Sequence, residues 1–283
     1  SYFLYRGYLL HKNYYLKMLK KLITTYLKEM KKILLSFDVE EFDLPREFNE
    51  EINDDDMYKI SYDGCVNLLN NLNVKATFFV TANFAKKYPS LIKKISERHE
   101  IGLHGDEHKD NYKNMTEKEF ETKITKAKKD IEKIISVKIQ GFRAPRLMIS
   151  DDKYRVLKNL GFEYDSSYIP SFVPGRYNNF FGKRSIFFKG ELKIIPLSVI
   201  PVIRMPMTWY VFRNLGLWYG KIGTKLNDNV CLIFHSWEFV DLSNFKIWRM
   251  IKRNTGRKMI GLLNKYIGWA EKNYEFIAMG DLK

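Results

Sequence analysis

Apolar and polar residues follow one another along this chain in short blocks that predict strands separated by helices. Eight apolar runs, rich in β-branched and aromatic residues, have the length and composition of strands. They cover residues 33–37, 74–81, 100–104, 138–142, 162–166, 193–199, 230–234 and 276–279. Helical patterns are expected near residues 58–72 and 83–98, and a further helix should run from a Ser150 cap to Leu160.

One helix is marked clearly at its start. The segment Thr116-Glu117-Lys118-Glu119 has the capping-box pattern, in which a threonine hydroxyl and a glutamate three residues later satisfy each other's backbone N–H groups. Apolar residues then recur at helical spacing and predict one buried face. They are Phe120, Ile124, Ala127, Ile131 and Ile134.

Strands that alternate with helices imply a parallel sheet covered on both faces. Seven or eight such units in about 250 residues suggest a closed or nearly closed barrel. Residues 171–190 break the alternation and are expected to form a long loop or insertion. The sequence therefore predicts one α/β domain over residues 31–283, preceded by a basic, amphipathic helical extension over residues 1–30.

The charge of the chain is uneven. The formal net charge is +15, and residues 1–32 contain eight lysines or arginines against the single acidic residue Glu29. Two interpretations remain open: a basic surface that attracts an anionic membrane or glycan, or a lysine-rich composition with an appended tail. Nucleic-acid binding is not expected, because no recognised binding motif accompanies the charge.

No stretch reaches 18 uncharged apolar residues, so no transmembrane helix is expected. The first residues lack the pattern of a signal peptide, because lysines interrupt their apolar residues. We therefore expect a cytoplasmic protein, with peripheral membrane contact through residues 1–30 as the alternative. Cys65 and Cys231 lie in separate apolar segments and are expected to be buried free thiols.

Polar residues that could bind a metal or transfer protons follow the predicted strands. In a β/α barrel, the loops after the strands form the active site. His104 and His108 stand four residues apart, a spacing at which two imidazoles can reach one cation. The other candidates at strand ends are Asp38, Glu40, Arg143, Asp165 and His235. Each has an ordinary structural explanation, but their repeated placement at strand ends favours a shared site.

These segments resemble the polysaccharide deacetylase family, also called the NodB homology or carbohydrate esterase 4 family. The resemblance covers residues 31–283 and rests on four motifs in family order. They are Ser36-Phe37-Asp38-Val39-Glu40, the histidine pair within residues 100–108, Phe142-Arg143-Ala144-Pro145 and Leu232-Ile233-Phe234-His235. It implies a distorted (β/α)7-type barrel and metal-dependent removal of N-acetyl, or sometimes O-acetyl, groups from sugars.

The first motif departs from the usual family pattern of two adjacent aspartates. Val39 stands at the second position and cannot bind a metal, so the sequence looks like an acid-x-acid version. We assign Asp38 as the base and Glu40 as the metal carboxylate, with the exchange of these two roles left open. The family's Asp-Trp motif after the fifth strand has no clear match.

The resemblance implies a mechanism for the remaining residues. Glu40, His104 and His108 would hold a divalent metal, zinc by default, with cobalt, nickel or manganese as alternatives. Asp38 would take a proton from the attacking water, and Arg143 would pair with Asp38 and orient it. His235, with an ordinary pKa of about 6.5, would protonate the departing amine.

The expected substrate is an acetylated glycan or a lipid-linked sugar, which implies a role in cell-surface glycan biosynthesis. The predicted substrate-binding residues are Trp237, Asp165 and Pro145. Asp165 is included because it lies near the position where the family has its Asp-Trp motif. Two alternatives remain. The same barrel could hydrolyse a small non-carbohydrate amide, or the chain could be a non-catalytic sugar-binding relative, although such a relative should lack Asp38 or His235.

Overall fold

The computed structural model describes residue 18, residues 30–174 and residues 177–283. The predicted extension over residues 1–30 therefore lies almost entirely outside the described residues. The contacts divide the chain into two units, residues 1–31 and residues 32–283. The sheet, the helices and the pocket belong to the second unit. No helix among the described residues is long and apolar enough to span a lipid bilayer.

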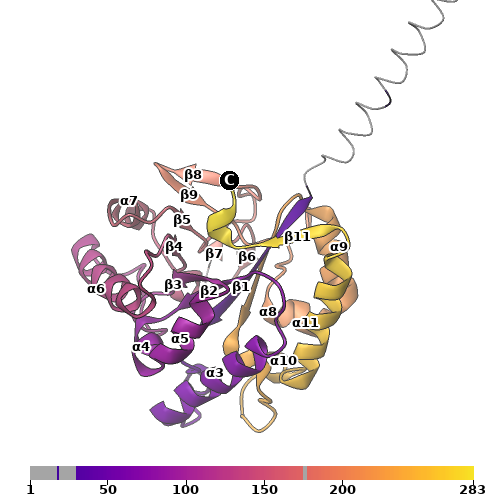
Figure 1. Cartoon of the computed structure of the whole chain (residues 1–283), viewed down its shortest axis with the longest axis horizontal. Coiled ribbons are helices and arrows are strands. Elements are labelled where there is room, and N and C mark those ends of the chain that lie inside the picture. The colour runs from indigo at the N-terminus through magenta and orange to yellow at the C-terminus, as the bar shows by residue number, and fades with distance from the viewer. Residues whose placement is uncertain (1–17, 19–29, 175–176) are drawn as a thin grey trace, which may run out of the picture. The chain divides into compact units, whose positions relative to one another are not determined.

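The centre of the fold is a curled sheet of parallel strands (Figure 1). Its parallel strands follow the order β10 (Val230–His235), β1 (Lys31–Val39), β2 (Thr77–Val80), β3 (Glu100–Leu103), β4 (Gly141–Phe142), β5 (Tyr164–Asp165) and β9 (Leu192–Ile194). At the edge, β8 (Phe187–Lys189) pairs antiparallel with β9. The last strand, β11 (Tyr274–Ile277), pairs with β1.

Irregular chain links the two ends of this sheet. The Ser198 N–H donates to the Cys231 carbonyl of β10 at 3.0 Å, and Thr208 forms a parallel bridge with Ile233. The sheet therefore curls into a half-barrel of parallel strands, consistent with the distorted β/α barrel that the sequence predicts. Each of the eight predicted strands overlaps an observed strand.

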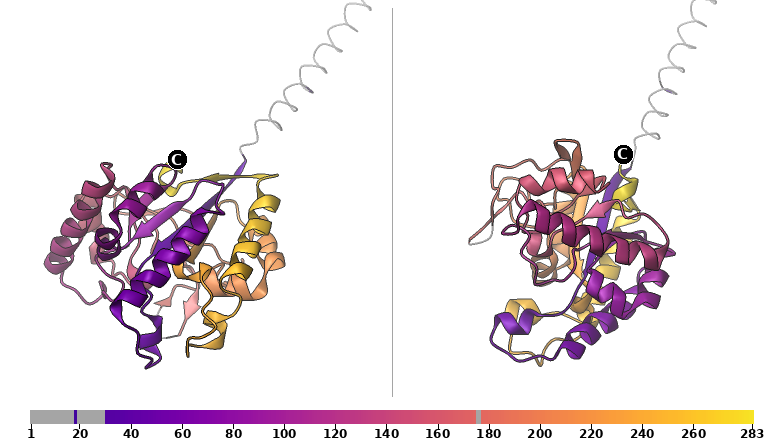
Figure 2. Two further views of the ribbon diagram at one scale, coloured as in Figure 1. Left: turned by 60° about the horizontal axis from the view of Figure 1, so that its bottom comes forward. Right: turned by 90° about the vertical axis from the view of Figure 1, so that its left-hand side faces the viewer.

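Helices cover the outside of the curled sheet, as the left-hand view in Figure 2 shows. They are α2 (Leu44–Glu47), α3 (Asp54–Leu69), α4 (Ala82–Lys87), α5 (Pro89–Ser96), α6 (Glu117–Ile135), α7 (Asp152–Asn159), α8 (Trp209–Leu215), α9 (Leu217–Leu226), α10 (Arg249–Lys252) and α11 (Arg257–Ala270). Single 3-10 turns are η1 (Pro145–Leu147), η2 (Ser236–Phe239) and η3 (Met279–Asp281). A small hairpin joins β6 (Phe172–Val173) and β7 (Tyr177–Asn178).

The capping box at the start of α6 is confirmed, with the Glu119 carboxylate accepting from the Thr116 N–H at 2.8 Å. The prediction of one helix over residues 83–98 is wrong, because Tyr88 leaves the helical region and Pro89 starts a new helix. The predicted Ser150 cap is also wrong, since α7 begins without a side-chain cap. Residues 171–190 are not all loop, because they contain β6, β7 and β8.

The turn after β10 is held close to α3 by a glycine. A Cβ atom added at Gly64 would lie 2.1 Å from the carbonyl oxygen of Ser236, far inside van der Waals contact. Both groups are backbone or directly attached to it, so neither can rotate away. This close approach fixes the segment that follows His235 and so helps to position that side chain.

We expect Gly64→Ala to destabilise the protein by about 1–3 kcal/mol, because the helix and the turn would have to separate. Chemical denaturation would measure the change. The matched control is Gly261→Ala inside α11, where an added Cβ meets nothing within 4 Å. Since alanine is the better helix former, the control should be neutral or stabilising by up to about 1 kcal/mol. Equal effects of the two changes would contradict this account.

Candidate active site

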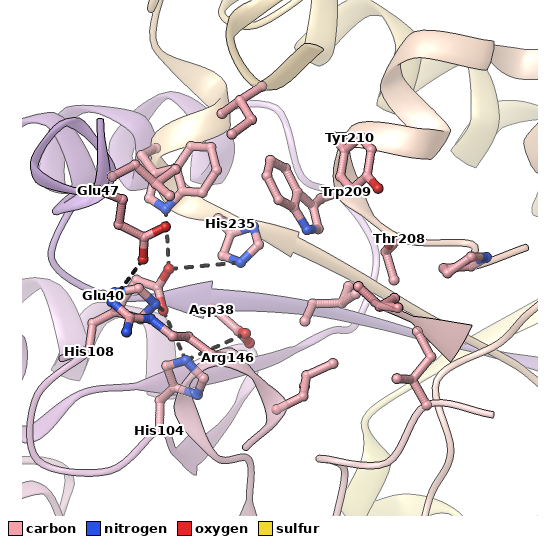
Figure 3. Close-up of a pocket in the computed structure, with 18 of the residues that line it drawn as sticks. Asp38, Glu40, Glu47, His104, His108, Arg146, Thr208, Trp209, Tyr210 and His235 are labelled. Atoms are coloured by element: carbon pink, nitrogen blue, oxygen red, sulfur yellow. Dashed lines mark hydrogen bonds and ion pairs between the residues drawn. The ribbon is translucent and has the colours of Figure 1, made fainter. Parts of the chain in front are cut away.

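The carboxyl ends of β1, β3 and β10 meet at a pocket of about 330 Å³ (Figure 3). Asp38 pairs in register with His235 across β1 and β10, so these two side chains enter the pocket from neighbouring strands. Glu40 follows β1 directly, and His104 follows β3. The structure therefore brings together residues that are far apart in sequence, as expected at the carboxyl edge of a barrel.

His104 is held in an orientation suited to metal binding. Its Nδ1 lies 2.9 Å from the carbonyl oxygen of Arg143, which can only accept, so Nδ1 carries a proton. Its Nε2 then faces Glu40 Oε2 at 2.9 Å and Asp38 Oδ2 at 3.6 Å. Two lone pairs this close need a proton or a cation between them.

His108 has the same arrangement on the other side of Glu40. Its Nδ1 lies 2.7 Å from the Asp43 carboxylate, and its Nε2 lies 3.5 Å from Glu40 Oε2. A carboxylate behind an imidazole fixes the ring and makes it a better ligand. Asp43 was not among the residues predicted from the sequence, although its place five residues after Asp38 was a usable signal.

Glu40 and His108 are both buried, and each shifts the pKa of the other. Burial alone would raise the pKa of Glu40, but the charge of His108 and the hydrogen bond with His104 hold it well below its usual range. Burial alone would lower the pKa of His108, but Glu40 and Asp43 raise it to about 9. The carboxylate is therefore charged, and the cluster stabilises positive charge at its centre.

The residues fit a divalent cation. Asp38, Glu40 and His104 each offer one ligand atom, and these atoms all lie within 4.8 Å of one another. Mixed carboxylate and imidazole donors suit zinc and its first-row neighbours. This cluster could therefore bind a metal, and the Nε2 of His108 lies beside it.

Asp38 is fixed by a fully buried arginine. Arg143 Nη1 donates to Asp38 Oδ1 at 2.7 Å, while its other nitrogens donate to the backbone oxygen and the hydroxyl of Ser166, both at 3.1 Å. The guanidinium also lies 4.1 Å from the centre of the Phe79 ring. These contacts fix the position of Arg143. Arg143 therefore orients Oδ1 of Asp38, while Oδ2 of Asp38 faces His104.

His235 stands on the opposite side of the pocket. Its ring stacks on Trp237 at 4.6 Å and meets Trp209 edge-on at 5.1 Å. Its Nε2 lies 3.8 Å from Glu40 Oε1. Burial lowers the pKa of His235 to about 4, although nearby carboxylates act in the opposite direction. The ordinary pKa of about 6.5 expected from the sequence is therefore not the one that this environment produces.

A buried ion pair supports His235 from behind. Glu238 Oε1 accepts from the His235 backbone N–H at 2.8 Å and lies 3.3 Å from its Nδ1. Glu238 Oε2 pairs with Arg213, and neither side chain is exposed. Arg213 Nε also donates to the Arg253 carbonyl at 2.8 Å. Neither residue was predicted from the sequence, because Glu238 follows His235 by three positions but nothing local links it to Arg213 in α8.

Aromatic rings form much of the remaining pocket wall, which includes Trp209, Tyr210, Trp237 and Trp248. The mouth carries an ion pair between Arg146 and Glu47, with Nη2 and Oε1 2.9 Å apart. The pocket thus combines a charged floor with an apolar, aromatic side. This combination suits a ring-shaped polar ligand, since sugar rings stack on aromatic faces and bond to polar groups.

Two of the predicted substrate-binding residues do not line this pocket. Asp165 is fully buried, and its carboxylate accepts from the N–H and hydroxyl of Ser167 at 3.0 and 2.5 Å. Burial raises the pKa of Asp165 to about 6. Pro145 is also buried at the start of η1. Trp237 does line the pocket, and the contact of Asp165 and Pro145 with substrate stays a prediction that the pocket lining does not support.

The fold and this site define a barrel with a carboxylate–histidine centre of hydrolase type. Residues 51–164 match the family model for polysaccharide deacetylase. This match covers less than half of the chain, and it agrees with the resemblance that the motifs predict. A comparison with curated proteins found no significant match.

Several solved structures share the fold at low sequence identity. A candidate polysaccharide deacetylase from Mycobacterium smegmatis is 20% identical, with 90% of each chain covered and a TM-score of 0.62. A peptidoglycan N-acetylglucosamine deacetylase is 16% identical, with 90% of this chain and 88% of that chain covered and a TM-score of 0.51. A CE4 family pseudoenzyme from Bacillus anthracis is 14% identical, with 90% and 66% covered and a TM-score of 0.52.

The Arg213–Glu238 pair generates a stability prediction. Arg213→Met would leave the Glu238 charge buried without its partner, so we expect a loss of about 3–5 kcal/mol in the free energy of unfolding. Denaturant titration would measure it. The control is Arg155→Met, which breaks the exposed pair with Glu117 and should change stability by no more than about 1 kcal/mol. A loss as small as that of the control would refute the structural role of the buried pair.

Proposed function

We propose that this protein is a metal-dependent hydrolase that removes acetyl groups, chiefly N-acetyl groups, from a sugar. One observation carries the proposal: two imidazoles, each held at Nδ1 by an acceptor, turn their Nε2 atoms toward Glu40, beside the arginine-bound Asp38. Such oriented nitrogens around a charged carboxylate are typical of a metal centre. The family match over residues 51–164 supports the same assignment.

Glu40, His104 and His108 would hold the metal, which we take to be zinc, with cobalt, nickel or manganese suited to the same ligands. A divalent cation there supplies Lewis acidity for the acetyl carbonyl and lowers the pKa of a water molecule. Asp38 also lies within reach of His104 Nε2, so the exchange of roles between Asp38 and Glu40 stays open. We favour Glu40 because it faces both imidazoles, whereas Asp38 is shared with Arg143.

Asp38 would act as the general base. Arg143 holds its Oδ1, so its Oδ2 remains free to take a proton from the attacking water. His235 would act as the general acid and protonate the departing sugar amine. Because burial lowers the pKa of His235 to about 4, its ring is neutral near pH 7 and must first take up a proton. The proton that Asp38 takes from the water would be passed to His235, and Glu238 at Nδ1 would stabilise the imidazolium until it protonates the amine.

The aromatic wall of the pocket supports a sugar as substrate. Trp209 and Tyr210 are only partly buried and can offer ring faces, whereas Trp237 is 2% exposed and mainly supports His235. One solved structure of the same fold is named as a peptidoglycan N-acetylglucosamine deacetylase, which favours an N-acetylated glycan here too. A role in cell-surface glycan biosynthesis, on a polymer or a lipid-linked sugar, follows from that substrate class.

One structural neighbour is a pseudoenzyme, so a non-catalytic sugar-binding role is the second candidate. The presence of Asp38, Arg143 and His235 in bonded positions argues against it, because a binding protein has no need of a buried base and acid. A small non-carbohydrate amide would use the same polar groups. It would leave most of the aromatic wall without contact.

The direct test is acetate release from N-acetylhexosamine oligosaccharides and lipid-linked N-acetyl sugars, with zinc added and with a chelator. We expect zinc-dependent release, and Asp38→Asn should lower turnover by about 10³-fold or more because the base is lost. The exposed Asp55→Asn variant is the control and should keep full activity. Sugar binding without acetate release from any substrate would instead support the non-catalytic candidate.

A second test addresses His235 through Glu238. We expect Glu238→Gln to lower turnover of an N-acetyl sugar by about 10- to 100-fold, because the amine needs a well-oriented acid. The same variant should change hydrolysis of 4-nitrophenyl acetate by less than about 3-fold, since that leaving group needs no proton. Steady-state kinetics on both substrates gives the ratio. Equal losses on the two substrates would argue against the acid role.

A further inference from the structure

Two loops beside the pocket present large apolar side chains to solvent. Phe172 in β6 is 54% exposed, and Phe181 in the loop after β7 is 94% exposed. Val202 and Ile203, from the turn after Ile200, are 86% and 60% exposed. Scattered apolar residues are normal on a surface, but Phe181 and Val202 are almost fully exposed, and each lies in a segment that has a second exposed apolar residue.

Arg204 ties these loops into one surface. Its Nη1 donates to the Gly182 carbonyl at 3.0 Å, and its own carbonyl accepts from the Ser171 hydroxyl at 2.8 Å. Each residue in these two hydrogen bonds is next in sequence to an exposed apolar residue. Gly182 follows Phe181, Ser171 precedes Phe172, and Arg204 follows Ile203. We call the four exposed apolar residues and their neighbouring cations the rim surface.

The same loops form part of the pocket wall, through Val173, Tyr177 and Pro206. The rim surface is therefore next to the mouth of the pocket. Whatever the rim surface binds will lie close to the substrate.

The turn that contains Val202 and Ile203 has a strained backbone. Val202 has φ 70° and Arg204 has φ 54°, both in the left-handed region. A β-branched residue is a genuine outlier there, because its side chain crowds the backbone. Strain of this kind persists where the surroundings enforce it, and it often marks a functional segment. Burial in this chain does not explain the conformation, since the Val202 side chain lies in solvent.

The rim surface is also basic. Lys183 and Arg184 follow Phe181 closely, and Arg204 follows Ile203. Within residues 30–174 and 177–283, none of these three cations forms an ion pair with a carboxylate. Each apolar tip therefore carries adjacent positive charge that the described part of the protein does not neutralise.

We propose that the rim surface docks on an anionic lipid bilayer, with its apolar side chains between the headgroups and its three cations against the phosphates. Protruding apolar tips with adjacent lysine or arginine are suited to such an interface. A bilayer needs no matching shape, whereas separate tips on two turns offer a protein partner little flat contact. The net charge of +15 acts in the same direction, since anionic leaflets attract basic segments.

This docking would place the pocket mouth at the membrane surface, within reach of an acetylated sugar carried on a lipid. That consequence rests on the proposed function. The docking itself does not, because it can be measured without any turnover.

The test uses the full chain labelled at single cysteines with the environment-sensitive dye NBD. Phe181→Cys places the dye on the rim surface, and Val137→Cys places it at an exposed residue after α6 as the control. Both native thiols are buried, so labelling is selective. With phosphatidylglycerol vesicles we expect a blue shift and an emission increase of at least about 3-fold at position 181 and none at position 137. Phosphatidylcholine vesicles should change neither.

A second variant separates the rim surface from any other contact with the vesicles. We expect the full-chain double variant Phe181→Ser/Val202→Ser to bind phosphatidylglycerol vesicles at least about 10-fold more weakly in a flotation assay, and Val137→Ser to bind as the parent does. Dye at position 181 that stays in water on these vesicles would overturn the proposal. So would a response to phosphatidylcholine equal to that to phosphatidylglycerol, or unchanged binding of the double variant.

Discussion

The parallel pairing of β1 with β10 is the contact on which the rest of the site depends. Its register sets Asp38 opposite His235, although the two strands come from opposite ends of the described domain. The same register turns Glu40 toward the imidazoles that follow β3. A slip of one residue would turn every side chain of a strand to the other face, so this register decides which groups meet.

Around that pairing, the buried charges are stabilised by specific partners. Asp38 has Arg143, Glu238 has Arg213, and Glu40 faces His104 and His108. Burying a charge is expensive unless it is paired and hydrogen-bonded. The two arginines are also held by backbone or hydroxyl oxygens, so each carboxylate has a fixed position before any ligand arrives. The site is therefore organised by the fold rather than by the ligand.

Local patterns predicted much of this arrangement. The apolar runs located all the parallel strands, and several of the polar residues after them come together in the candidate site, because the carboxyl ends of parallel strands meet at one edge. Asp165 shows where that reasoning fails. It is the last residue of β5, much as Asp38 lies near the carboxyl end of β1, but its carboxylate accepts hydrogen bonds from Ser167 and does not line the pocket. Strand position alone does not determine where a side chain points.

Long-range partners could not be predicted in the same way. Glu238 is near His235 in sequence, yet its importance depends on Arg213 from α8, and no spacing rule connects them. The break at Tyr88 is a local feature, but a proline at residue 89 is compatible with either a new helix or a kinked one. The exposed turn around Val202 could not be predicted from the spacing of apolar residues. Its distinguishing feature is the positive φ of Val202 and Arg204, which that spacing does not reveal.

The proposed chemistry depends above all on Glu40 as the carboxylate that would hold a metal between the imidazoles of His104 and His108. The most direct measurement is the zinc content of purified Glu40→Gln and Asp38→Asn proteins after equilibrium dialysis, determined by elemental analysis beside the parent protein. We predict about one zinc per chain in the parent protein and in Asp38→Asn, and a large loss in Glu40→Gln. Loss of zinc in Asp38→Asn with retention in Glu40→Gln would contradict the assignment.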